Sequence, residues 1–270
     1  MISRFDSWDD PANGTLDDQY HLLRVATSKP LDPNVTYTVL RGDPSNPTPA
    51  VSTTYATLAE LTGPPVVCFV HGTMIETDRG PVAVELLSAG DLIVTRDNGL
   101  QAVRWIGTQV LDSRWLAVKP DLRPVRIAKG ALRAGLPNAD LMVSPQHRIL
   151  VRSAIAQKMF GTDVVLVAAK QLLQIEGMDI VDADQGLEYF HMLFDRHEVV
   201  ISNGAETEPL YPGPEALNTV GAAALDEILA IFPELADDAE GQVAARELVS
   251  VRLGRKLALR HAQNDKPLVS

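Results

Sequence analysis

Short runs of apolar and β-branched residues, each followed by a turn signal, dominate the middle of the chain. Such runs, without the three- to four-residue spacing of a helix, are typical of strands. Asp97-Asn98-Gly99 lies between the apolar runs 92–95 and 102–106, and Asn203-Gly204 follows the run 198–201. Both turns favour positive φ and predict hairpins closed by type I′ turns. Further strands are predicted at Thr73–Thr77, Val125–Ile127, Arg148–Val151 and Val164–Val167.

The pattern changes on either side of this region. Residues 1–67 are polar and rich in turns, have strand propensity at Val35–Leu40, and end on a rigid Gly63-Pro64-Pro65 connector. From Pro214 onward, apolar residues recur every three or four positions and predict two helices. The first carries Leu217, Val220, Ala224, Ile228 and Ile231; the second, between about 242 and 260, carries Leu248, Val251 and Leu257. We therefore predict a small N-terminal segment (1–67), an all-β domain (68–213) and a helical C-terminal extension (214–270).

Composition narrows the class of protein. The chain has 270 residues, 46% of them hydrophobic, and a net charge of −11 with no basic block, which argues against nucleic-acid and membrane partners. The N-terminus lacks the apolar core of a secretory signal, so we expect cytoplasmic synthesis, with export by a signal-independent route left open. One cysteine excludes an internal disulfide and a multi-thiolate zinc site, and we expect neither a metal nor a cofactor.

That cysteine, Cys68, directly follows the Pro-Pro connector and Val66-Val67, and it opens a strand-like segment. A thiol at the start of a domain can reach the preceding carbonyl carbon through a five-membered ring and convert the Val67–Cys68 amide into a thioester. The reaction is uphill in an unstrained peptide, so it needs strain, oxyanion stabilisation and a proton donor for the departing nitrogen. Water, or an external thiol or amine, can then cleave the thioester.

Three other residues are candidates to support this chemistry. His147 lies between two apolar runs, where its ring can be fixed and can donate a proton to the leaving nitrogen. Ser144 could orient that ring or hold the scissile carbonyl. His191 could help to deprotonate Cys68, because the thiolate is the nucleophile. Asp195 and His197, in the same segment as His191, are interpreted as residues that hold a tight loop.

Three blocks of sequence follow one another across about residues 66–212. They are Cys68-Phe69 with Gly72-Thr73, Ile75, Val84–Leu87, Gly90-Asp91 and Thr95; Ser144-Pro145-Gln146-His147; and Tyr189–Gly204. In order and spacing these blocks resemble the Hint (Hedgehog/intein) domains, especially the bacterial Hint domains outside true inteins.

The resemblance implies a flattened all-β horseshoe of curved hairpins. It implies that Cys68 is the nucleophile and that His147 bonds to the scissile amide nitrogen. Ser144 stands where the family usually has Thr, and His191 stands where the family often has an Asp or Cys that assists the nucleophile.

The chain also departs from the two-step members of the family. In the family that the chain resembles, splicing is a reaction at both ends of the domain, and it uses a terminal His-Asn pair followed by Cys, Ser or Thr. In this chain, Asn203 follows Ser202 and precedes Gly204. Sterol transfer of the Hedgehog kind uses an Asp after the first hairpin, where this chain has Trp105-Ile106-Gly107-Thr108.

The sequence therefore predicts autocatalytic cleavage at Val67–Cys68 without splicing, with the chain's own N-terminal segment as substrate. Two alternatives stay open: an inert Hint-like binding module, and a papain-like cysteine hydrolase using Cys68, His147 and Asn203. A metal site built from His71, His147, His191 and His197 is a weaker alternative, because only His191 and His197 are close in sequence.

Overall fold

The structure is a computed structural model that describes residues 38–40, 52–54, 67–211, 228 and 243–270. The chain forms two compact units, Met1–Thr62 and Gly63–Ser270. In the first unit, β1 (Thr38–Leu40) pairs antiparallel with β2 (Ser52–Thr54). The predicted strand 35–40 is thus seen in its last three residues, and the rest of it lies outside the described residues.

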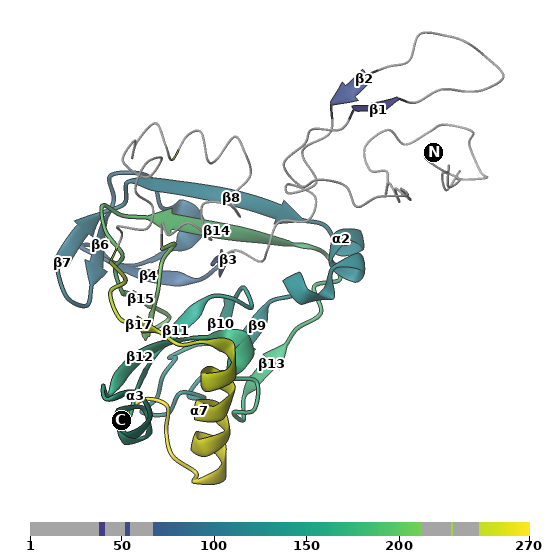
Figure 1. Cartoon of the computed structure of the whole chain (residues 1–270). Coiled ribbons are helices and arrows are strands. Elements are labelled where there is room, and N and C mark those ends of the chain that lie inside the picture. Colours follow the sequence, from purple (N-terminus) through teal and green to yellow (C-terminus); the bar gives the residue numbers. More distant parts are fainter. Residues whose placement is uncertain (1–37, 41–51, 55–66, 212–227, 229–242) are drawn as a thin grey trace. The chain divides into compact units, whose positions relative to one another are not determined.

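The second unit contains a six-stranded antiparallel sheet that carries Cys68 at one of its central strands. Figure 1 shows its two long strands, β8 and β14, side by side. In order across the sheet, the strands are β13 (Met178–Ile180), β9 (Val125–Ile127), β10 (Leu141–Val143), β3 (Phe69–Val70), β14 (Leu187–Leu193) and β8 (Trp105–Leu111).

A nine-stranded sheet completes the unit, and all its pairings are antiparallel except that of β12 with β17. In this sheet β5 (Gly80–Ala83) pairs only with β4, off the main order. The main order is β17 (Glu247–Leu248), β12 (Val164–Ala168), β11 (Arg148–Arg152), β16 (Ala205–Thr207), β15 (Val200–Ser202), β4 (Met74–Thr77), β6 (Leu92–Thr95) and β7 (Gly99–Ala102).

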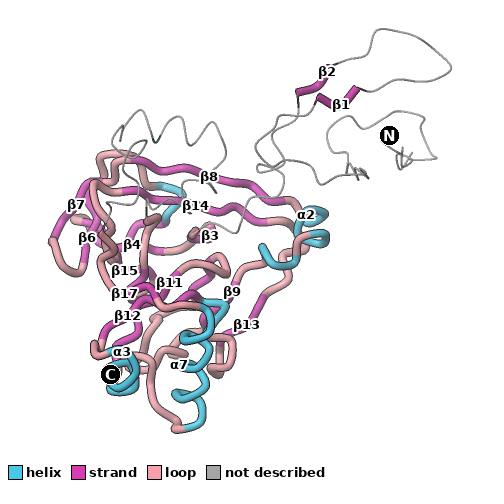
Figure 2. The backbone as a smooth tube through the Cα atoms, in the orientation of Figure 1, coloured by secondary structure: helices cyan, strands magenta, loops and turns pink. Residues whose placement is uncertain are grey.

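Helices are short and few in the part of the chain that the structure describes, as the cyan segments of Figure 2 show. They are α2 (Ser113–Val118), α3 (Ala154–Phe160) and α7 (Val251–Gln263), with 3₁₀ turns at Val84–Leu86, Pro120–Leu122 and Ala169–Gln171. The longest, α7, packs on α3 and β12 and buries Leu257 and Ala258 in the main core. Close packing fixes Gly254 on this helix, because an added Cβ would lie 1.7 Å from Gln171 Oε1.

The six-stranded sheet separates two apolar clusters, and β14 shows the separation most clearly. Phe190 and Met192 face the main core, whereas Tyr189 and Leu193 face a second cluster that includes Cys68. Alternate residues of a strand point to opposite faces, so His191 lies on the same face as Tyr189 and Leu193. The strand therefore presents its imidazole to the cysteine while its even-numbered residues stabilise the fold.

The all-β prediction with a C-terminal helix is confirmed. The strands predicted at 73–77, 125–127, 148–151 and 164–167 correspond to β4, β9, β11 and β12 to within one residue at either end. Neither the short strands β5, β10, β13 and β17 nor the helices α2 and α3 are predicted, because their apolar positions are too few to show a period.

The two predicted hairpin turns differ in outcome. Asn203 and Gly204 have φ of 45° and 78° between the paired residues Ser202 and Ala205, which confirms a type I′ turn. In the first hairpin only Gly99 has a positive φ, of 65°, and Thr95 pairs with Gly99. A type I′ turn is therefore wrong there, and the second strand begins at Gly99 rather than at residue 102.

The C-terminal helix begins at Val251 rather than near residue 242, so that part of the prediction is wrong. Glu247 and Leu248 extend instead along β12 as its parallel neighbour, and Val249 N–H donates to Leu166 O at 3.0 Å. Pairing with the exposed edge of β12 satisfies backbone groups that a longer helix would leave unpaired. Ile228 is buried, but the rest of the first predicted helix lies outside the described residues.

Candidate active site

The peptide bond between Val67 and Cys68 is hydrogen-bonded at both of its polar ends. The Cys68 N–H donates to Ser144 Oγ at 3.0 Å, and Val67 O lies 3.0 Å from His191 Nδ1. A carbonyl oxygen only accepts, so the second contact requires the proton of a neutral His191 to be on Nδ1. Each end of the amide therefore contacts one of the residues that the sequence singles out.

The Cys68 thiol lies beside the same imidazole. Its Sγ is 3.4 Å from Nδ1 and 3.6 Å from Nε2 of His191. Burial raises the pKa of the Cys68 thiol well above its ordinary value, although the hydrogen bond with Ser144 lowers it in part. The resting group is therefore a thiol and not a thiolate, so attack on a carbonyl needs a base at the moment of reaction.

The imidazole of His191 is held neutral by its surroundings. Burial lowers the pKa of His191 to about 4, against a smaller opposing effect of the Val67 carbonyl. A neutral imidazole with its proton on Nδ1 has a free lone pair on Nε2. This tautomer donates to the carbonyl, and its unprotonated Nε2 lies 3.6 Å from Cys68 Sγ.

Ser144 and His147 reach the site from the turn that joins β10 to β11. The backbone N–H of His147 donates to Ser144 O at 3.0 Å, and Pro145 occupies the second position of the turn, where its fixed φ is suitable. Ser144 N–H also donates to Cys68 O at 3.0 Å. The turn is thereby fixed to the residue on which it would act.

His147 is fully buried, with its ring edge against Phe69 at a centroid distance of 4.5 Å. Neither ring nitrogen forms a hydrogen bond of ordinary geometry with any residue that the structure describes, although the Cys68 backbone acts on the ring. Burial lowers the pKa of His147 to about 3, and the Cys68 backbone opposes this shift. His147 is thus neutral at pH 7 and can pass a proton on only after receiving one.

An apolar cluster surrounds the Val67–Cys68 peptide bond and keeps it away from bulk water. Cys68 is 1% exposed and Val67 is 9% exposed. The other members of the cluster are Val70, Trp105, Leu111, Leu116, Tyr189, Leu193, Leu210 and Ile228. In such a dry environment, hydrogen bonds to a developing oxyanion are stronger than in water.

Trp105 and Gly107 are residues that the sequence interpretation missed as parts of the site. The indole of Trp105 is nearly parallel to the imidazole of His191, with 23° between the planes and 6.4 Å between the centroids. The available signal was a glycine two positions after a tryptophan in a predicted strand, because a glycine inside a strand often marks a close approach.

The remaining polar candidates have structural partners elsewhere. Asn203 Oδ1 accepts from Met74 N–H and its Nδ2 donates to Asp140 O, both at 2.8 Å. Asp195 forms an ion pair with Arg104 at 3.3 Å. The structure therefore does not bring Asn203 or Asp195 to Cys68.

His197 and His71 also have neighbours of their own. His197 Nε2 lies 3.2 Å from Glu208 Oε2, and its Nδ1 accepts from Ala245 N–H at 3.1 Å. His71 is exposed and lies 3.4 Å from Glu85. Among the residues that the structure describes, no group of three or more His, Cys, Asp or Glu could hold a metal ion.

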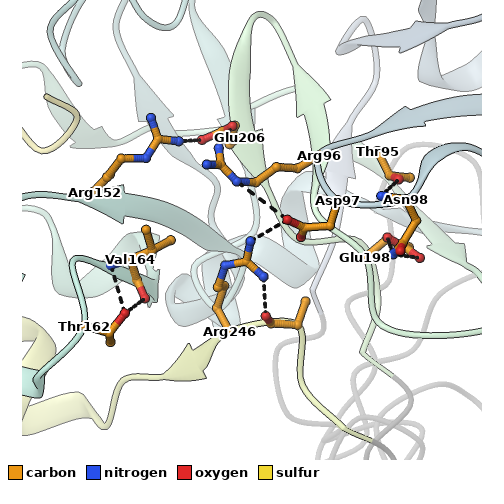
Figure 3. Close-up of polar contacts among 11 residues, drawn as sticks. Thr95, Arg96, Asp97, Asn98, Arg152, Thr162, Val164, Glu198, Glu206 and Arg246 are labelled. Atoms are coloured by element: carbon orange, nitrogen blue, oxygen red, sulfur yellow. Dashed lines mark hydrogen bonds and ion pairs between the residues drawn. The ribbon is translucent and has the colours of Figure 1, made fainter.

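A separate polar network attaches the C-terminal segment to the nine-stranded sheet (Figure 3). Arg246 is paired with Asp97 at 2.6 Å, and Arg152 with Glu206 at 2.6 Å. Glu206 also pairs with Arg96. The Arg246–Asp97 pair joins the segment before β17 to the turn after β6, and the two pairs of Glu206 join β16 to β11 and to the same turn.

The fold and site together define an all-β protein with a buried cysteine thiol beside a buried histidine. The Hint domain family matches residues 67–214, which is more than half of the 270 residues. The chain belongs to the Hint domain family, as the sequence blocks indicated.

Solved structures of similar proteins include intein-like domains. A bacterial intein-like domain from Clostridium thermocellum is 16% identical, with 53% of this chain and 97% of that chain covered and a TM-score of 0.38. A DnaB intein from Synechocystis is 10% identical, with 53% and 98% covered and a TM-score of 0.34. No curated protein sequence matches the chain. None of the described helices is long and apolar enough to span a membrane.

Proposed function

We propose that the chain cleaves itself at Val67–Cys68 through a thioester and does not splice. In the first step Cys68 Sγ forms a bond to the Val67 carbonyl carbon, and the bond from that carbon to the Cys68 nitrogen breaks. The thiol proton ends on the nitrogen, so the step is an isomerisation that leaves a free α-amine on Cys68. Water, or an external thiol or amine, then displaces the Cys68 thiol and releases residues 1–67.

One observation carries the proposal: the Val67–Cys68 amide is bonded at its N–H and at its C=O, with the thiol beside it. Ser144 accepts from the N–H, and His191 Nδ1 faces the carbonyl. As the thiol attacks, negative charge develops on Val67 O, and the donor already in place stabilises it. Removal of one such donor commonly slows an enzyme by roughly 10²–10³-fold.

The two histidines have different tasks in this proposal. His191 accepts the thiol proton on Nε2, since Nδ1 carries its own proton toward Val67 O. The proton must then reach the Cys68 nitrogen, and His147 is the other buried base adjacent to the Cys68 backbone. His147 relays this proton to the departing nitrogen, because in its neutral form it must first receive one.

Restriction to N-terminal cleavage follows from the environment of Asn203. Cyclisation needs the Asn side-chain nitrogen free to attack its own carbonyl, but here that nitrogen donates to Asp140 O. Ser202 and Gly204 supply no acid for the next peptide nitrogen. The Asn203 turn therefore supports one-ended processing.

The test is mass spectrometry of the purified full chain, incubated at pH 7 with and without dithiothreitol. We expect slow release of a fragment that begins at Cys68, accelerated by the thiol because it intercepts the thioester. The matched control is Cys68→Ala, which lacks the nucleophile and should stay intact. His147→Ala should slow the release by roughly 10²–10⁴-fold.

The raised pKa of the buried Cys68 thiol favours a second candidate, an inert Hint-like binding module. A full-length mass unchanged after days in thiol at neutral pH would favour that candidate. Cleavage of the Cys68→Ala chain at the same bond would exclude the thioester route.

A further inference from the structure

Trp105, Gly107 and His191 lie on one face of the six-stranded sheet. In the pairing of β8 with β14, Gly107 is opposite His191, and Trp105 is opposite Leu193. Alternation along the two strands places all four side-chain positions on the face of the Cys68 cluster. The indole and the imidazole are thus diagonal neighbours across two strands.

Residue 107 must be a glycine because the Trp105 ring leaves no room for a side chain there, and not because of its backbone conformation. Its φ lies outside the left-handed region, so other residues could adopt its backbone. A Cβ at this position would lie 2.2 Å from Cη2 and 2.4 Å from Cζ2 of Trp105. The six-membered ring of the indole therefore lies over the Gly107 backbone, in the position that a side chain would otherwise occupy.

This placement brings the indole against the reacting imidazole. Trp105 is 5% exposed, and its ring is 23° from parallel with that of His191. Nδ1 of the same imidazole also lies 3.0 Å from Val67 O and 3.4 Å from Cys68 Sγ. Rotation of the ring away from this orientation would break the contact with the scissile carbonyl.

We propose that Trp105, lying over Gly107, is a positioning residue that holds His191 with Nδ1 toward the Val67 carbonyl. The proposal rests on the proposed self-cleavage and adds to it the pair of residues that orients its base. Trp105 does not touch the scissile bond; it acts by fixing the imidazole and by excluding water from its face.

The titratable groups that share this environment are Cys68, His147 and Tyr189. All three are uncharged at pH 7, because burial raises the pKa of Cys68 and of Tyr189 and lowers the pKa of His147 to about 3. Access of water after loss of the indole is therefore the main effect that would change the protonation of His191.

The experiment compares Trp105→Ala, Trp105→Phe, Gly107→Ala and the double variant Trp105→Ala/Gly107→Ala, with Thr108→Ala as an exposed control on the same strand. The cleavage rate is measured from pH 4 to 8, and ¹⁵N NMR of the His191 ring is recorded in a Cys68→Ala background. We expect Trp105→Ala and Gly107→Ala each to slow cleavage roughly 10- to 100-fold. In both variants, the pH below which the cleavage rate falls should rise from about 4, the pKa of His191, toward the ordinary pKa of an imidazole. Trp105→Phe should recover part of the rate.

The double variant separates positioning from a general loss of stability. The three atoms nearest to a Cβ at residue 107 all belong to Trp105, so without the indole Gly107→Ala should slow Trp105→Ala little further. An acid limb that stays in place in Trp105→Ala and Gly107→Ala, or additive effects of the two changes, would overturn the proposal. If the wild-type chain does not cleave, the self-cleavage proposal fails alone, and the NMR spectrum still decides whether Trp105 fixes the tautomer and pKa of His191.

Discussion

His191 Nδ1 lies 3.0 Å from the carbonyl oxygen of Val67, although 124 residues separate the two in the chain. The same ring has Nε2 at 3.6 Å from Cys68 Sγ. In the proposed mechanism His191 both donates to Val67 O and accepts the proton of the Cys68 thiol. A substitution that keeps a donor at the position of Nδ1 but removes the base should separate these two tasks. Asn resembles His at the Nδ1 position, because its amide can donate from the same place, but it is not a base.

We therefore expect His191→Asn and His191→Ala both to cleave very slowly at pH 7. As pH rises toward 10, both rates should increase about tenfold per unit, because the thiolate then forms without a base. His191→Asn should be the faster of the two throughout, since its amide still donates to Val67 O. Equal rates for the two variants at every pH, followed by mass spectrometry, would remove the carbonyl contact from the mechanism.

Ser144 gives a second pair of variants. Ser144→Thr keeps the hydroxyl that accepts from Cys68 N–H and should cleave within a few-fold of the wild-type rate. Ser144→Ala leaves that buried N–H without an acceptor, which costs about 1–3 kcal/mol, and it should cleave at least roughly tenfold more slowly. The rates are compared by single-turnover mass spectrometry, and a fast Ser144→Ala chain would show that the hydroxyl is dispensable.

Acid should destabilise the fold through the two buried histidines. The folded-state pKa of His191, about 4, lies below the ordinary value near 6.5, so between these values the unfolded chain binds a proton that the folded chain does not. The contribution of His191 to the free energy of unfolding is therefore fully present above pH 6.5, decreases as pH falls through this window, and levels off below 4. From pH 7 to 4.5 the loss through His191 alone is about 2–3 kcal/mol.

Urea unfolding of the Cys68→Ala chain at pH 7 and pH 4.5 measures this loss. Addition of His191→Gln should reduce the difference between the two pH values, whereas Thr108→Ala, a non-titrating substitution at an exposed position of β8, should leave it unchanged. A difference that survives the His191 substitution in full would assign the acid sensitivity to other groups, with His147 the next to test.

Asn203 should matter for stability and not for cleavage. Asn203→Ala removes two hydrogen bonds, to Met74 N–H and Asp140 O, and places a Cβ-bearing residue without compensation at φ of 45°. The expected loss is about 2–4 kcal/mol, with normal N-terminal cleavage at temperatures where the chain is folded. Asn203→Gly tolerates the positive φ and should lose less. Denaturant titration gives the stabilities, and a native fragment beginning at Gly204, absent from Asn203→Ala, would reopen two-ended processing.

Local patterns were sufficient to predict strands whose own residues carry the signal. Asn203-Gly204 closes a type I′ turn because both residues accept positive φ without help from the rest of the fold. Asp97-Asn98-Gly99 carries a similar signal, yet Asn98 does not take positive φ: its side chain bonds to Glu198 at 2.9 Å, and its backbone N–H to Thr95 Oγ1 at 3.3 Å. The turn at Asn98 thus differs from type I′, and in this turn the Asn98 side chain contacts Glu198, 100 residues further along the chain.

The site shows the same limit. Cys68, Ser144, His147 and His191 could be chosen from sequence because each lies in a recognisable block. Nothing in those blocks reveals that His147 is neutral, since the low pKa arises from burial against residues such as Phe69. The placement of the Trp105 indole beside His191 depends on the pairing of β8 with β14, in which Gly107 is opposite His191, 84 positions further along the chain, and no local pattern records that pairing.

The separation of the site residues along the chain also sets an order in time. Ser144 lies 76 residues after Cys68, and His191 lies 123 residues after it. During synthesis at roughly 5–20 residues per second, His191 is added roughly 6–25 s after Cys68. Because β14 must also pair with β3 and β8 before its imidazole faces Val67, the segment 1–67 leaves the ribosome well before Cys68, Ser144 and His191 are brought together. Under the proposed self-cleavage, the position of His191 late in the chain delays release of the N-terminal segment until β14 has been made and paired.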